Sequence, residues 1–439
     1  MTNFDGFGLC APLLQAVQEE GYATPTPIQA GAIGPLLQGR DLIGLAQTGT
    51  GKTAAFTLPL LHRLAEKRRA PPRLGARVLI LAPTRELASQ IGDSVNRYGR
   101  HLGLSATVVF GGVGQGRQVE ALRRGVDVLV AAPGRLLDLC GQRLCDLSGV
   151  EALVLDEADR MLDMGFLRDI RRVIALLPPE RQTALFSATL SPSIATLAHS
   201  LLRDPARVEV TPPSSTVQRI RQTVMFVEAE AKKEALLHLV SQRSVERAIV
   251  FTLMKHEANK VSDALTEAGI SAAAIHGNKS QNRREAALNG FRDGSVKVLV
   301  ATDIAARGID VDDVTHVFNF DLPNEPASYV HRIGRTGRAG REGWAVSLCD
   351  PDQRAWLRDI EREIGKPIPV FAGHPWHSEA AQNSTRPAPK LGGGGGRGRT
   401  GRPGAPPRQG SGPSRGSGGR GPAVGAPKRG GPPGGSRRR

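Results

Sequence analysis

Short apolar runs that alternate with helix-length segments constrain the fold of this 439-residue chain more than any other feature. Each run is bounded by turn-forming residues, and enough chain follows it to form one helix. Near-continuous apolar strands separated by helices indicate a parallel sheet with helices on both faces. In the first half we expect strands at residues 41–46, 77–82, 127–132, 152–156 and 183–187.

The alternation stops at residues 211–219, a Pro/Ser-rich stretch that we interpret as a linker between domains. It then resumes, and we expect further strands at 248–252, 272–275, 297–302 and 316–320. The predicted fold class is therefore α/β, with two tandem domains at residues 1–210 and 220–372, each built on a parallel sheet.

The composition changes again near Gly373, after which Gly, Arg, Pro and Ser dominate. Such a segment buries too little apolar surface to offset the entropy of ordering it, so residues 373–439 are predicted to be a disordered basic tail. The chain has a net charge of +16, and its last 60 residues hold 13 Lys and Arg but no Asp or Glu. The rest of the chain is nearly balanced, which indicates that the tail is an arm for a polyanion.

Membrane and secreted classes are disfavoured. The sequence has no run of about 18 apolar residues, so we expect no membrane span. The N-terminus lacks the basic region of a secretory signal, and we therefore expect a cytoplasmic protein. The cysteines lack the spacing of a zinc site, and we interpret them as reduced thiols. They are Cys10, Cys140, Cys145 and Cys349.

The segment AQTGTGKT, residues 46–53, lies between an apolar run and a helix-compatible segment, which is the context of a phosphate-binding loop. Gly49 and Gly51 allow the backbone to curl so that its N–H groups point at phosphate. Lys52 would reach the terminal phosphates of ATP, and the Thr53 hydroxyl would ligate Mg²⁺. Ala46 stands where the usual pattern has glycine, and a Gly-rich turn with an incidental lysine is the alternative. The candidate nucleotide-binding residues here are Ala46, Gln47, Thr48, Gly49, Thr50, Gly51, Lys52 and Thr53.

Two carboxylates end the apolar run at 152–156. Asp156 would hold Mg²⁺ through its waters, and Glu157 would orient and deprotonate the water that attacks ATP. An acidic helix N-terminus is the alternative interpretation of this DEAD tetrapeptide. The phosphate loop about 100 residues upstream, at a matching strand end, favours the catalytic interpretation.

Over roughly residues 4–365 the chain resembles the DEAD-box RNA helicases, and within that family the bacterial RhlE type. The resemblance implies two RecA-like domains of the P-loop NTPase fold. It also implies that GYATPTPIQ, residues 21–29, recognises adenine, with Gln29 hydrogen-bonding the base edge and Tyr22 stacking on its face. An amide can match the donor and acceptor of adenine. The alternative is that Pro25 and Pro27 only shape a turn.

The same resemblance implies RNA-backbone contacts in the first domain. Loop-to-helix starts after Pro83 and Pro133 would present free N–H groups to phosphate. Family members usually have Thr at the position of Ala132, so one hydroxyl contact to RNA is missing from the pattern. The candidate RNA-binding residues are Pro83, Thr84, Arg85, Gly111, Gly112 and Arg135. Ser187, Ala188 and Thr189 resemble the element that couples ATP state to unwinding, with a plain helix N-cap at Ser187 as the alternative.

In the second domain the resemblance extends to four segments. Gln281, Arg284, Thr252, Thr302 and Arg307 correspond to RNA contacts. Asp310 corresponds to a contact with the ATP ribose, and His331 to a contact with the Ser187–Thr189 segment. Arg335 and Arg338 match the family's arginine fingers, which reach the γ-phosphate, and a helical turn would put them on one face. An exposed basic helix is the alternative.

Together these patterns predict an ATP-dependent RNA helicase that uses ATP and Mg²⁺ and unwinds RNA locally and without reading its sequence. A non-catalytic RNA chaperone acting through the tail, and a DNA translocase of similar architecture, are the alternatives. We expect RNA as the main partner and a monomeric core. Ribosomal and RNA-decay complexes are both candidate settings.

Overall fold

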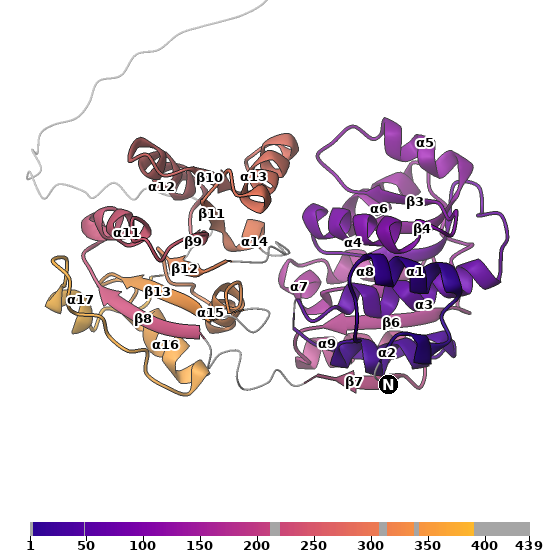
Figure 1. Ribbon diagram of the computed structural model, residues 1–439, viewed down its shortest axis with the longest axis horizontal. Coiled ribbons are helices and arrows are strands. Elements are labelled where there is room, and N and C mark those ends of the chain that lie inside the picture. Colours follow the sequence, from indigo (N-terminus) through magenta and orange to yellow (C-terminus); the bar gives the residue numbers. More distant parts are fainter. Residues whose placement is uncertain (1–2, 48, 211–219, 307–313, 338–341, 390–439) are drawn as a thin grey trace, which may run out of the picture. The chain divides into compact units, whose positions relative to one another are not determined.

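The computed structural model describes residues 3–47, 49–210, 220–306, 314–337 and 342–389. In the first of its two α/β domains, parallel strands form one sheet in the order β3-β4-β2-β5-β6-β1-β7 (Figure 1). The strands are β1 (Leu42–Leu45), β2 (Ala76–Leu81), β3 (Ala106–Val109), β4 (Val126–Ala131), β5 (Ala152–Leu155), β6 (Gln182–Ser187) and β7 (Ala206–Glu209).

The second domain repeats this topology. Its parallel strands follow the order β10-β11-β9-β12-β13-β8. Ranked by their place along the chain, the strands of both sheets run third, fourth, second, fifth, sixth and first, and β7 extends the first sheet at one edge. The strands are β8 (Ile220–Phe226), β9 (Ala248–Thr252), β10 (Ala272–Ile275), β11 (Val298–Thr302), β12 (His316–Asn319) and β13 (Gly343–Cys349).

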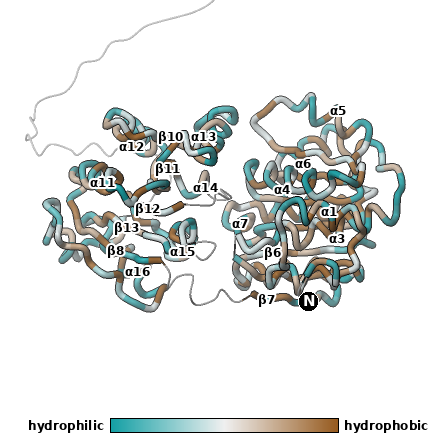
Figure 2. Tube along the Cα trace, in the orientation of Figure 1, coloured by the Kyte–Doolittle hydropathy of each residue, from teal (hydrophilic) through white to brown (hydrophobic). Residues whose placement is uncertain are grey.

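Each sheet lies between two helical layers because successive strand residues point to opposite faces. On β2, Val78 and Ile80 pack into one core, whereas Leu79 and Leu81 pack into another. In Figure 2 brown apolar segments run through the strands of each domain, while outer helices such as α13 (Gln281–Asp293) are mostly teal. The alternating apolar runs of the sequence are thus explained by strands buried on both faces.

The helices on the two faces of the first sheet belong to different apolar clusters. One cluster contains α1 (Ala11–Glu19), α2 (Pro27–Leu37), α3 (Lys52–Glu66) and α4 (Arg85–Tyr98). The other contains α5 (Gly116–Arg124), α6 (Pro133–Gly141), α7 (Ala158–Asp163), α8 (Leu167–Ile174) and α9 (Pro192–Leu201).

The helices of the second domain surround its sheet in the same way. They are α11 (Lys232–Val240), α12 (Lys255–Glu267), α13, α14 (Asp303–Ala306), α15 (Pro326–Ile333), α16 (Arg354–Ile364) and α17 (Glu379–Gln382). Short 3-10 turns, Asp5–Phe7 and Ala229–Ala231, precede α1 and α11.

The nine strands expected from the sequence are all present, with ends that differ by at most one residue. The sequence interpretation missed four strands. They are β3, β7, β8 and β13. In β7 and the start of β8 buried and less buried residues alternate, as at the edge positions these strands hold, so neither begins as a continuous apolar run.

The assignment of residues 373–389 to a structureless tail is wrong. Ala381 is fully buried in the core that contains Trp356 and Ile360 of α16, and the Ser384 hydroxyl donates to the carbonyl oxygen of Pro351 at 2.6 Å. The Ser378 backbone N–H also donates to the carbonyl oxygen of Phe226 at 2.9 Å. This segment therefore completes the second domain. The linker at 211–219 and the tail from residue 390 onward lie outside the described residues.

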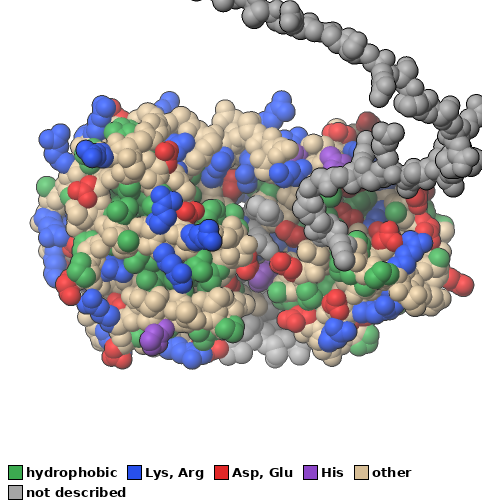
Figure 3. Space-filling model, turned by 180° about the vertical axis from the view of Figure 1, so that it is seen from behind, with side chains coloured by type: hydrophobic (Ala, Val, Ile, Leu, Met, Phe, Trp, Pro, Cys, Tyr) green, Lys and Arg blue, Asp and Glu red, His purple; other side chains and the backbone are tan. Residues whose placement is uncertain are grey.

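Charged side chains of both signs intermingle over the face seen in Figure 3. That distribution agrees with the near-balanced charge of the chain outside its last 60 residues. Among the described residues no helix is long and apolar enough to cross a membrane.

Candidate functional site

The carboxyl edge of the first sheet divides into two halves. The phosphate loop, the Ser187–Thr189 segment and the acidic pair follow β1, β6 and β5, which are adjacent strands. The segments expected to bind RNA follow β2, β4 and β3, which form the other half of the sheet. Because parallel strands end at one edge, the topology brings both sets of candidate residues to the same side of the domain.

The phosphate loop leads directly into α3, whose first residue is Lys52. Lys52 is buried, and its ammonium donates to the carbonyl oxygen of Ala46 at 2.9 Å. Gly51 has a φ of 88°, and a Cβ there would lie 2.4 Å from Nε2 of Gln29, so only glycine fits this position. Thr50 donates its hydroxyl hydrogen to the carbonyl oxygen of Gln47 at 2.7 Å. Thr48 lies outside the described residues.

The acidic pair is buried beside this loop: Asp156 is 2% exposed and Glu157 6%. Burial raises the pKa of Asp156 to about 6, and the Lys52 ammonium opposes the rise. Burial also disfavours the charged form of Glu157, but the cations of Arg160 and Lys52 outweigh it and lower the pKa of Glu157 to about 2. Burial thus disfavours the charged form of both carboxylates, and only at Glu157 do the neighbouring cations overcome that effect.

Glu157 has a φ of 52°, in the left-handed region that non-glycine residues seldom adopt. It is the N-cap of α7, and its carboxylate accepts a hydrogen bond from the buried Arg160 guanidinium. The alternative interpretation of the tetrapeptide as the acidic start of a helix also holds, because Asp159 lies in the first turn of α7. Backbone strain of this kind collects at functional sites, where surrounding contacts hold it in place.

The donor set fits Mg²⁺, a hard cation that prefers oxygen ligands and keeps several waters when it binds nucleotide phosphates. Asp156 offers a buried carboxylate that accepts a hydrogen bond at 3.0 Å from the Glu157 backbone N–H through one oxygen, Oδ1. Thr53, the second residue of α3, adds a hydroxyl at the loop. Phosphate and water oxygens would complete the coordination.

The adenine-recognition candidate Gln29 joins its own segment to the phosphate loop. Its Oε1 accepts from the backbone N–H of Thr26 at 2.9 Å, and its Nε2 donates to the carbonyl oxygen of Gly51 at 3.2 Å. A primary amide has two acceptor and two donor positions, so one of each stays available for a base. Pro27 also begins α2, so the turn-forming role of this segment is real but does not exclude recognition. Tyr22 is 37% exposed.

Asp159, which the sequence interpretation did not assign, fastens the Ser187–Thr189 segment to the acidic pair. Its Oδ2 accepts from the backbone N–H groups of Ala188 at 3.0 Å and Thr189 at 3.1 Å. Ser187 ends β6, and the next helix, α9, begins at Pro192 with Ser191 as its N-cap. The alternative of a helix N-cap at Ser187 is therefore wrong.

On the other half of the edge, two arginines converge on the turn after β3. The Arg85 guanidinium lies so close to Gly112, whose φ is 79°, that a Cβ there would overlap it. Arg135 donates to the carbonyl oxygen of Val113 at 3.2 Å. The backbone N–H of Leu87 donates to the hydroxyl of the α4 N-cap, Thr84, at 3.3 Å, whereas Ala132, the N-cap of α6, has no side-chain acceptor. The three predicted RNA segments are thus brought together in space.

In the second domain, Thr252 and Thr302 end β9 and β11, which are adjacent strands. Gln281 is the first residue of α13, which follows the next strand, β10, and Arg284 lies one turn further on. In the second sheet these residues thus occupy the half that corresponds to the half of the first sheet with the RNA candidates. Arg307 and Asp310 lie outside the described residues.

The arginine-rich segment 331–338 is anchored by a residue that the sequence interpretation passed over. Arg332 is 2% exposed and holds Asp303 through two bonds of 2.5 and 2.6 Å. The helix α15 ends at Ile333, so Arg335 lies in the turn that follows it. Gly334 is the C-cap of this helix, so the helical turn expected to hold Arg335 does not form there. Arg338 lies outside the described residues, so the expectation that the two arginines share one face stays a prediction. His331, in the last turn of α15, is exposed.

Lys232 is a further buried cation that no sequence motif indicated. It is the first residue of α11, and its ammonium lies 3.2 Å from Oδ1 of Asp321 and 2.7 Å from Oδ2 of Asp350. Gln353 donates to the same Oδ1 of Asp321 at 3.0 Å. The only sequence signal for this cluster would have been two aspartates that follow strands and a lysine at the start of a helix.

A Gly-rich loop between strand and helix, a buried lysine, and an acidic pair two strands away define a P-loop NTPase, and the repeated sheet makes it a two-domain one. The family model described as DEAD/DEAH box helicase matches residues 26–197, and the model described as helicase conserved C-terminal domain matches residues 231–340.

Individual relatives point the same way. The chain is 43% identical over 362 residues to the DEAD-box ATP-dependent RNA helicase CshA of Bacillus cereus, covering 82% of this chain and 68% of that protein. It is 41% identical over 378 residues to the ATP-dependent RNA helicase CshA of Listeria monocytogenes, covering 86% and 71%. The solved structure of S. cerevisiae Dbp5 bound to RNA and ADP BeF3 matches with a TM-score of 0.74 and 33% identity, over 84% of this chain and 96% of that one.

The chain belongs to the DEAD-box family of ATP-dependent RNA helicases. It is an enzyme, an RNA-dependent ATPase that acts on RNA, and the expectations for fold, family and activity are confirmed. The relatives named above carry the name CshA, and the likeness to the RhlE type stays a prediction.

Proposed function

We propose that ATP is bound and hydrolysed on the β5-β6-β1 half of the first sheet. The observation that carries this proposal is the buried trio of Lys52, Asp156 and Glu157 around the phosphate loop. Lys52 binds the terminal phosphates, and the loop residues 46–53 cradle them with backbone N–H groups. Glu157, ionised at neutral pH, accepts a hydrogen bond from the attacking water and takes its proton as the bond to phosphorus forms.

Mg²⁺, when bound, would neutralise phosphate charge, and Thr53 and Asp156 are the residues that would hold it, Asp156 through water. The buried Asp156 carboxylate, whose pKa burial raises, supports this assignment because a nearby cation would compensate its charge.

Adenine is read by Gln29 and Tyr22. The free donor and acceptor of the Gln29 amide match the base edge, and the exposed part of the Tyr22 ring offers a stacking surface. Since Gln29 also donates to the carbonyl oxygen of Gly51, base recognition is mechanically joined to the phosphate loop.

RNA is bound along the other half of each sheet by backbone contacts. Thr84, Arg85, Arg135 and the Gly111–Gly112 turn serve the first domain, and Thr252, Gln281, Arg284 and Thr302 serve the second. Arg307 is a further contact expected from the sequence. Contacts to phosphate and 2′-OH select RNA without reading its sequence.

ATP and RNA act together by favouring one closed arrangement of the two domains. In that arrangement Arg335 and Arg338 reach the γ-phosphate, Asp310 meets the ribose, and His331 contacts the Ser187–Thr189 segment. Each ligand binds both domains, so each increases the affinity for the other. RNA bent across the closed site loses its regular duplex, and hydrolysis reopens the domains.

The cationic tail adds sequence-independent affinity for RNA through its Lys and Arg side chains. Cytoplasmic location, a monomeric core, and work within ribosomal or RNA-decay complexes complete the proposal. In the described residues all four cysteines are free thiols, as expected in a reducing compartment.

The test of this proposal is Glu157→Gln, with Glu180→Gln as the matched control, because the Glu180 side chain is 87% exposed. We expect Glu157→Gln to retain ATP and RNA binding and to lose phosphate release, measured with and without RNA, while the control behaves as wild type. Multiple turnovers by Glu157→Gln at the wild-type rate would refute the assignment of Glu157.

A further inference from the structure

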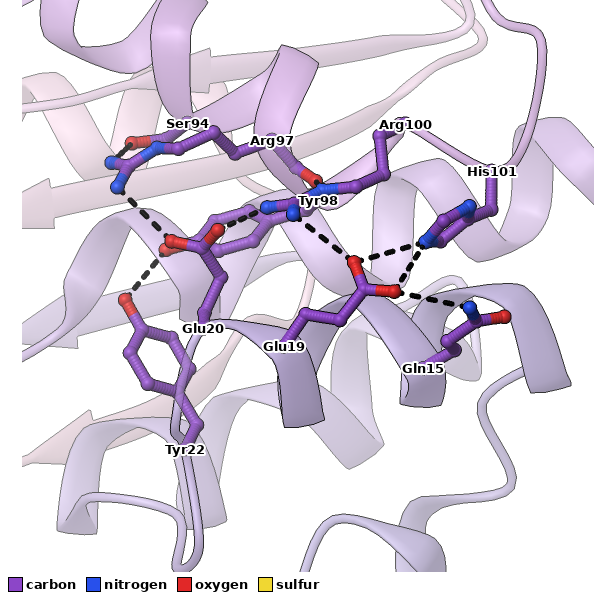
Figure 4. A network of polar contacts seen from close by, with 9 residues as sticks. All are labelled: Gln15, Glu19, Glu20, Tyr22, Ser94, Arg97, Tyr98, Arg100 and His101. Atoms are coloured by element: carbon purple, nitrogen blue, oxygen red, sulfur yellow. Dashed lines mark hydrogen bonds and ion pairs between the residues drawn. The ribbon is translucent and has the colours of Figure 1, made fainter.

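Tyr22 is held by a polar network that belongs to no recognised motif. The network joins the end of α1 and the residues after it to the end of α4 (Figure 4). Figure 4 shows Gln15, Glu19, Glu20 and Tyr22 on one side facing Ser94, Arg97, Tyr98, Arg100 and His101 on the other. All of these residues lie in the first domain.

The centre of the network is a hydrogen bond of 3.0 Å between the hydroxyls of Tyr22 and Tyr98. The Tyr22 ring has two other rings nearby, with centroids 6.4 Å away at Phe4 and 6.1 Å away at Tyr98. Tyr98 is 2% exposed, so its position is fixed by the core of the domain. Tyr22 is the opposite, with 37% of its surface exposed, and therefore depends on its neighbours for a defined orientation.

Around this bond, charged pairs fasten the two helix ends together. Glu20 accepts from Arg97 at 3.0 Å and also from Arg100. Glu19 accepts from Arg100 and from His101, each at 3.0 Å. Among these charged side chains Glu20 is the most buried, with 14% of its side chain exposed. Its ion pairs are therefore shielded from water more than an ordinary surface pair.

These contacts set the geometry of Tyr22, the second residue of the adenine-recognition segment. A side chain that is already held by a hydrogen bond loses less entropy when it stacks on a ligand than a mobile one. A hydroxyl-to-hydroxyl bond constrains a tyrosine ring along its length, which stacking against Phe4 alone does not.

We infer that Tyr98 is a positioning residue for nucleotide recognition: its hydroxyl, supported by the glutamate–arginine pairs, holds the Tyr22 ring in the orientation that stacks on adenine. This inference rests on the proposed role of Tyr22. Tyr98 itself touches no substrate, so it contributes to binding the base and not to the chemistry at phosphorus.

The experiment uses the full chain with Tyr98→Phe, which removes one oxygen atom and keeps the buried ring. The chain has three tyrosines, and the third supplies the matched control, because Tyr329 is also buried and its hydroxyl donates to Oε1 of Gln222 at 3.1 Å. Tyr22→Phe and the double variant test whether one shared bond is responsible. The measurements are KM and kcat for ATP and for GTP at saturating RNA, together with the unfolding midpoint.

For Tyr98→Phe we expect KM for ATP to rise about three- to tenfold, the equivalent of one lost hydrogen bond, with kcat within about twofold of wild type. The preference for ATP over GTP should narrow by a similar factor. Tyr22→Phe should give the same result, and the double variant should add nothing further, because both single changes break one bond. Tyr329→Phe should lower the unfolding midpoint about as much as Tyr98→Phe does, and it should leave KM for ATP unchanged.

A KM for ATP in Tyr98→Phe that equals wild type, or a rise that Tyr329→Phe reproduces, would overturn the inference. Tyr22→Ala separates it from the underlying proposal. If Tyr22→Ala leaves KM for ATP unchanged, Tyr22 does not stack on the base and the adenine assignment fails as well. If Tyr22→Ala raises KM but Tyr98→Phe does not, the adenine assignment stands and only the role of Tyr98 is refuted.

Discussion

Lys52 in the first domain and Lys232 in the second occupy the same place in the same topology. Each is the first residue of the helix that follows the first strand of its sheet. Each is buried, and each faces an aspartate that follows the fifth strand, Asp156 or Asp321. The surroundings differ, since Lys232 is neutralised by Asp321 and Asp350, whereas the Lys52 ammonium donates to the loop carbonyl of Ala46.

The difference shows that a phosphate site needs more than a lysine at a helix start. In the second domain the connection from β8 to α11 is a short 3-10 turn without glycine, and carboxylates occupy the place of phosphates. The opposite half of the edge is different, because both domains keep polar RNA candidates at the ends of the second, third and fourth strands. The nucleotide half is thus built once and the RNA half twice.

We propose that the second domain contributes to hydrolysis through its arginines, because carboxylates surround Lys232 at the position equivalent to the phosphate site. Arg335→Ala and Arg338→Ala should each lower kcat by about 10³-fold, because an arginine finger stabilises charge that develops only in the transition state. Phosphate release at saturating ATP and RNA measures this. Arg362 is an exposed arginine of the same domain, and the control variant Arg362→Ala should leave kcat unchanged. Turnover near wild type in either finger variant would leave the second domain without a part in the chemistry.

The same substitution at the two equivalent lysines sharpens the comparison. Lys52→Met should weaken ATP binding about 100-fold or more while changing the unfolding free energy little. Lys232→Met should leave KM for ATP unchanged and cost about 3–5 kcal/mol of stability, because two buried carboxylates lose their cation.

Tryptophan fluorescence can separate these effects, since Trp344, Trp356 and Trp376 all belong to the second domain and the chain has no other tryptophan. In denaturant, the fluorescence transition should shift only for Lys232→Met. A shift for both variants would mean that the two lysines are structural equivalents and the comparison fails.

Lowering the pH should destabilise the second domain through a buried histidine. Burial lowers the pKa of His316 on β12 to about 4, with a smaller contribution from Lys297. The unfolded chain takes up this proton near pH 6.5, so the stability that the neutral ring contributes is present above pH 6.5 and is lost as the pH falls towards 4. The loss is at most about 3 kcal/mol.

The variant that tests this is His316→Phe, which keeps the stacking against Phe318 and Trp344 but cannot titrate. The tryptophan transition measured at pH 7.5 and pH 5 should move less in His316→Phe than in wild type. Equal pH dependence in the two proteins would assign the effect to other groups.

The smallest expected effect concerns the RNA half of the first domain. Ala132→Thr would give α6 the N-cap oxygen that it lacks and would add a hydroxyl beside Pro133. We expect RNA affinity to rise about two- to fivefold and the first domain to gain about 1 kcal/mol or less. Affinity titrations at one fixed salt concentration measure it, with Ala132→Ser as a second capping residue. A weaker affinity in both variants would show that the alanine is required at this edge.

Much of the fold follows from the sequence, because strands buried on both faces leave continuous apolar runs such as 77–82 and 127–132. In the edge strand β7 partly buried and exposed residues alternate, so it leaves no such signal and was missed. The helix end at Ile333 was misjudged because the spacing of Arg335 and Arg338 was weighed above Gly334, the C-cap of the helix.

The site shows the same division. Lys52, Asp156 and Glu157 could be identified because each sits in a short motif at a strand end. Asp159 lies within such a motif, but its bonds to Ala188 and Thr189 join segments 29 and 30 residues apart. Arg332 and Lys232 act through partners that only the folded topology reveals. Residues whose work is long-range pairing leave no local pattern.

The packing of residues 373–389 has a practical meaning for anyone who divides the chain. The motifs end near residue 338, and the change of composition suggests a cut near residue 372. A fragment ending there would uncover the surface of α16 and β8 that Ala381 covers, and would leave the Arg354 and Arg358 side chains without the carbonyl oxygens of Gln382 and Ser384. Newly exposed apolar surface promotes association between molecules. Such a fragment would retain the RNA- and ATP-binding candidates of the two domains but would tend to associate, whereas one ending at Pro389 would keep the second domain whole.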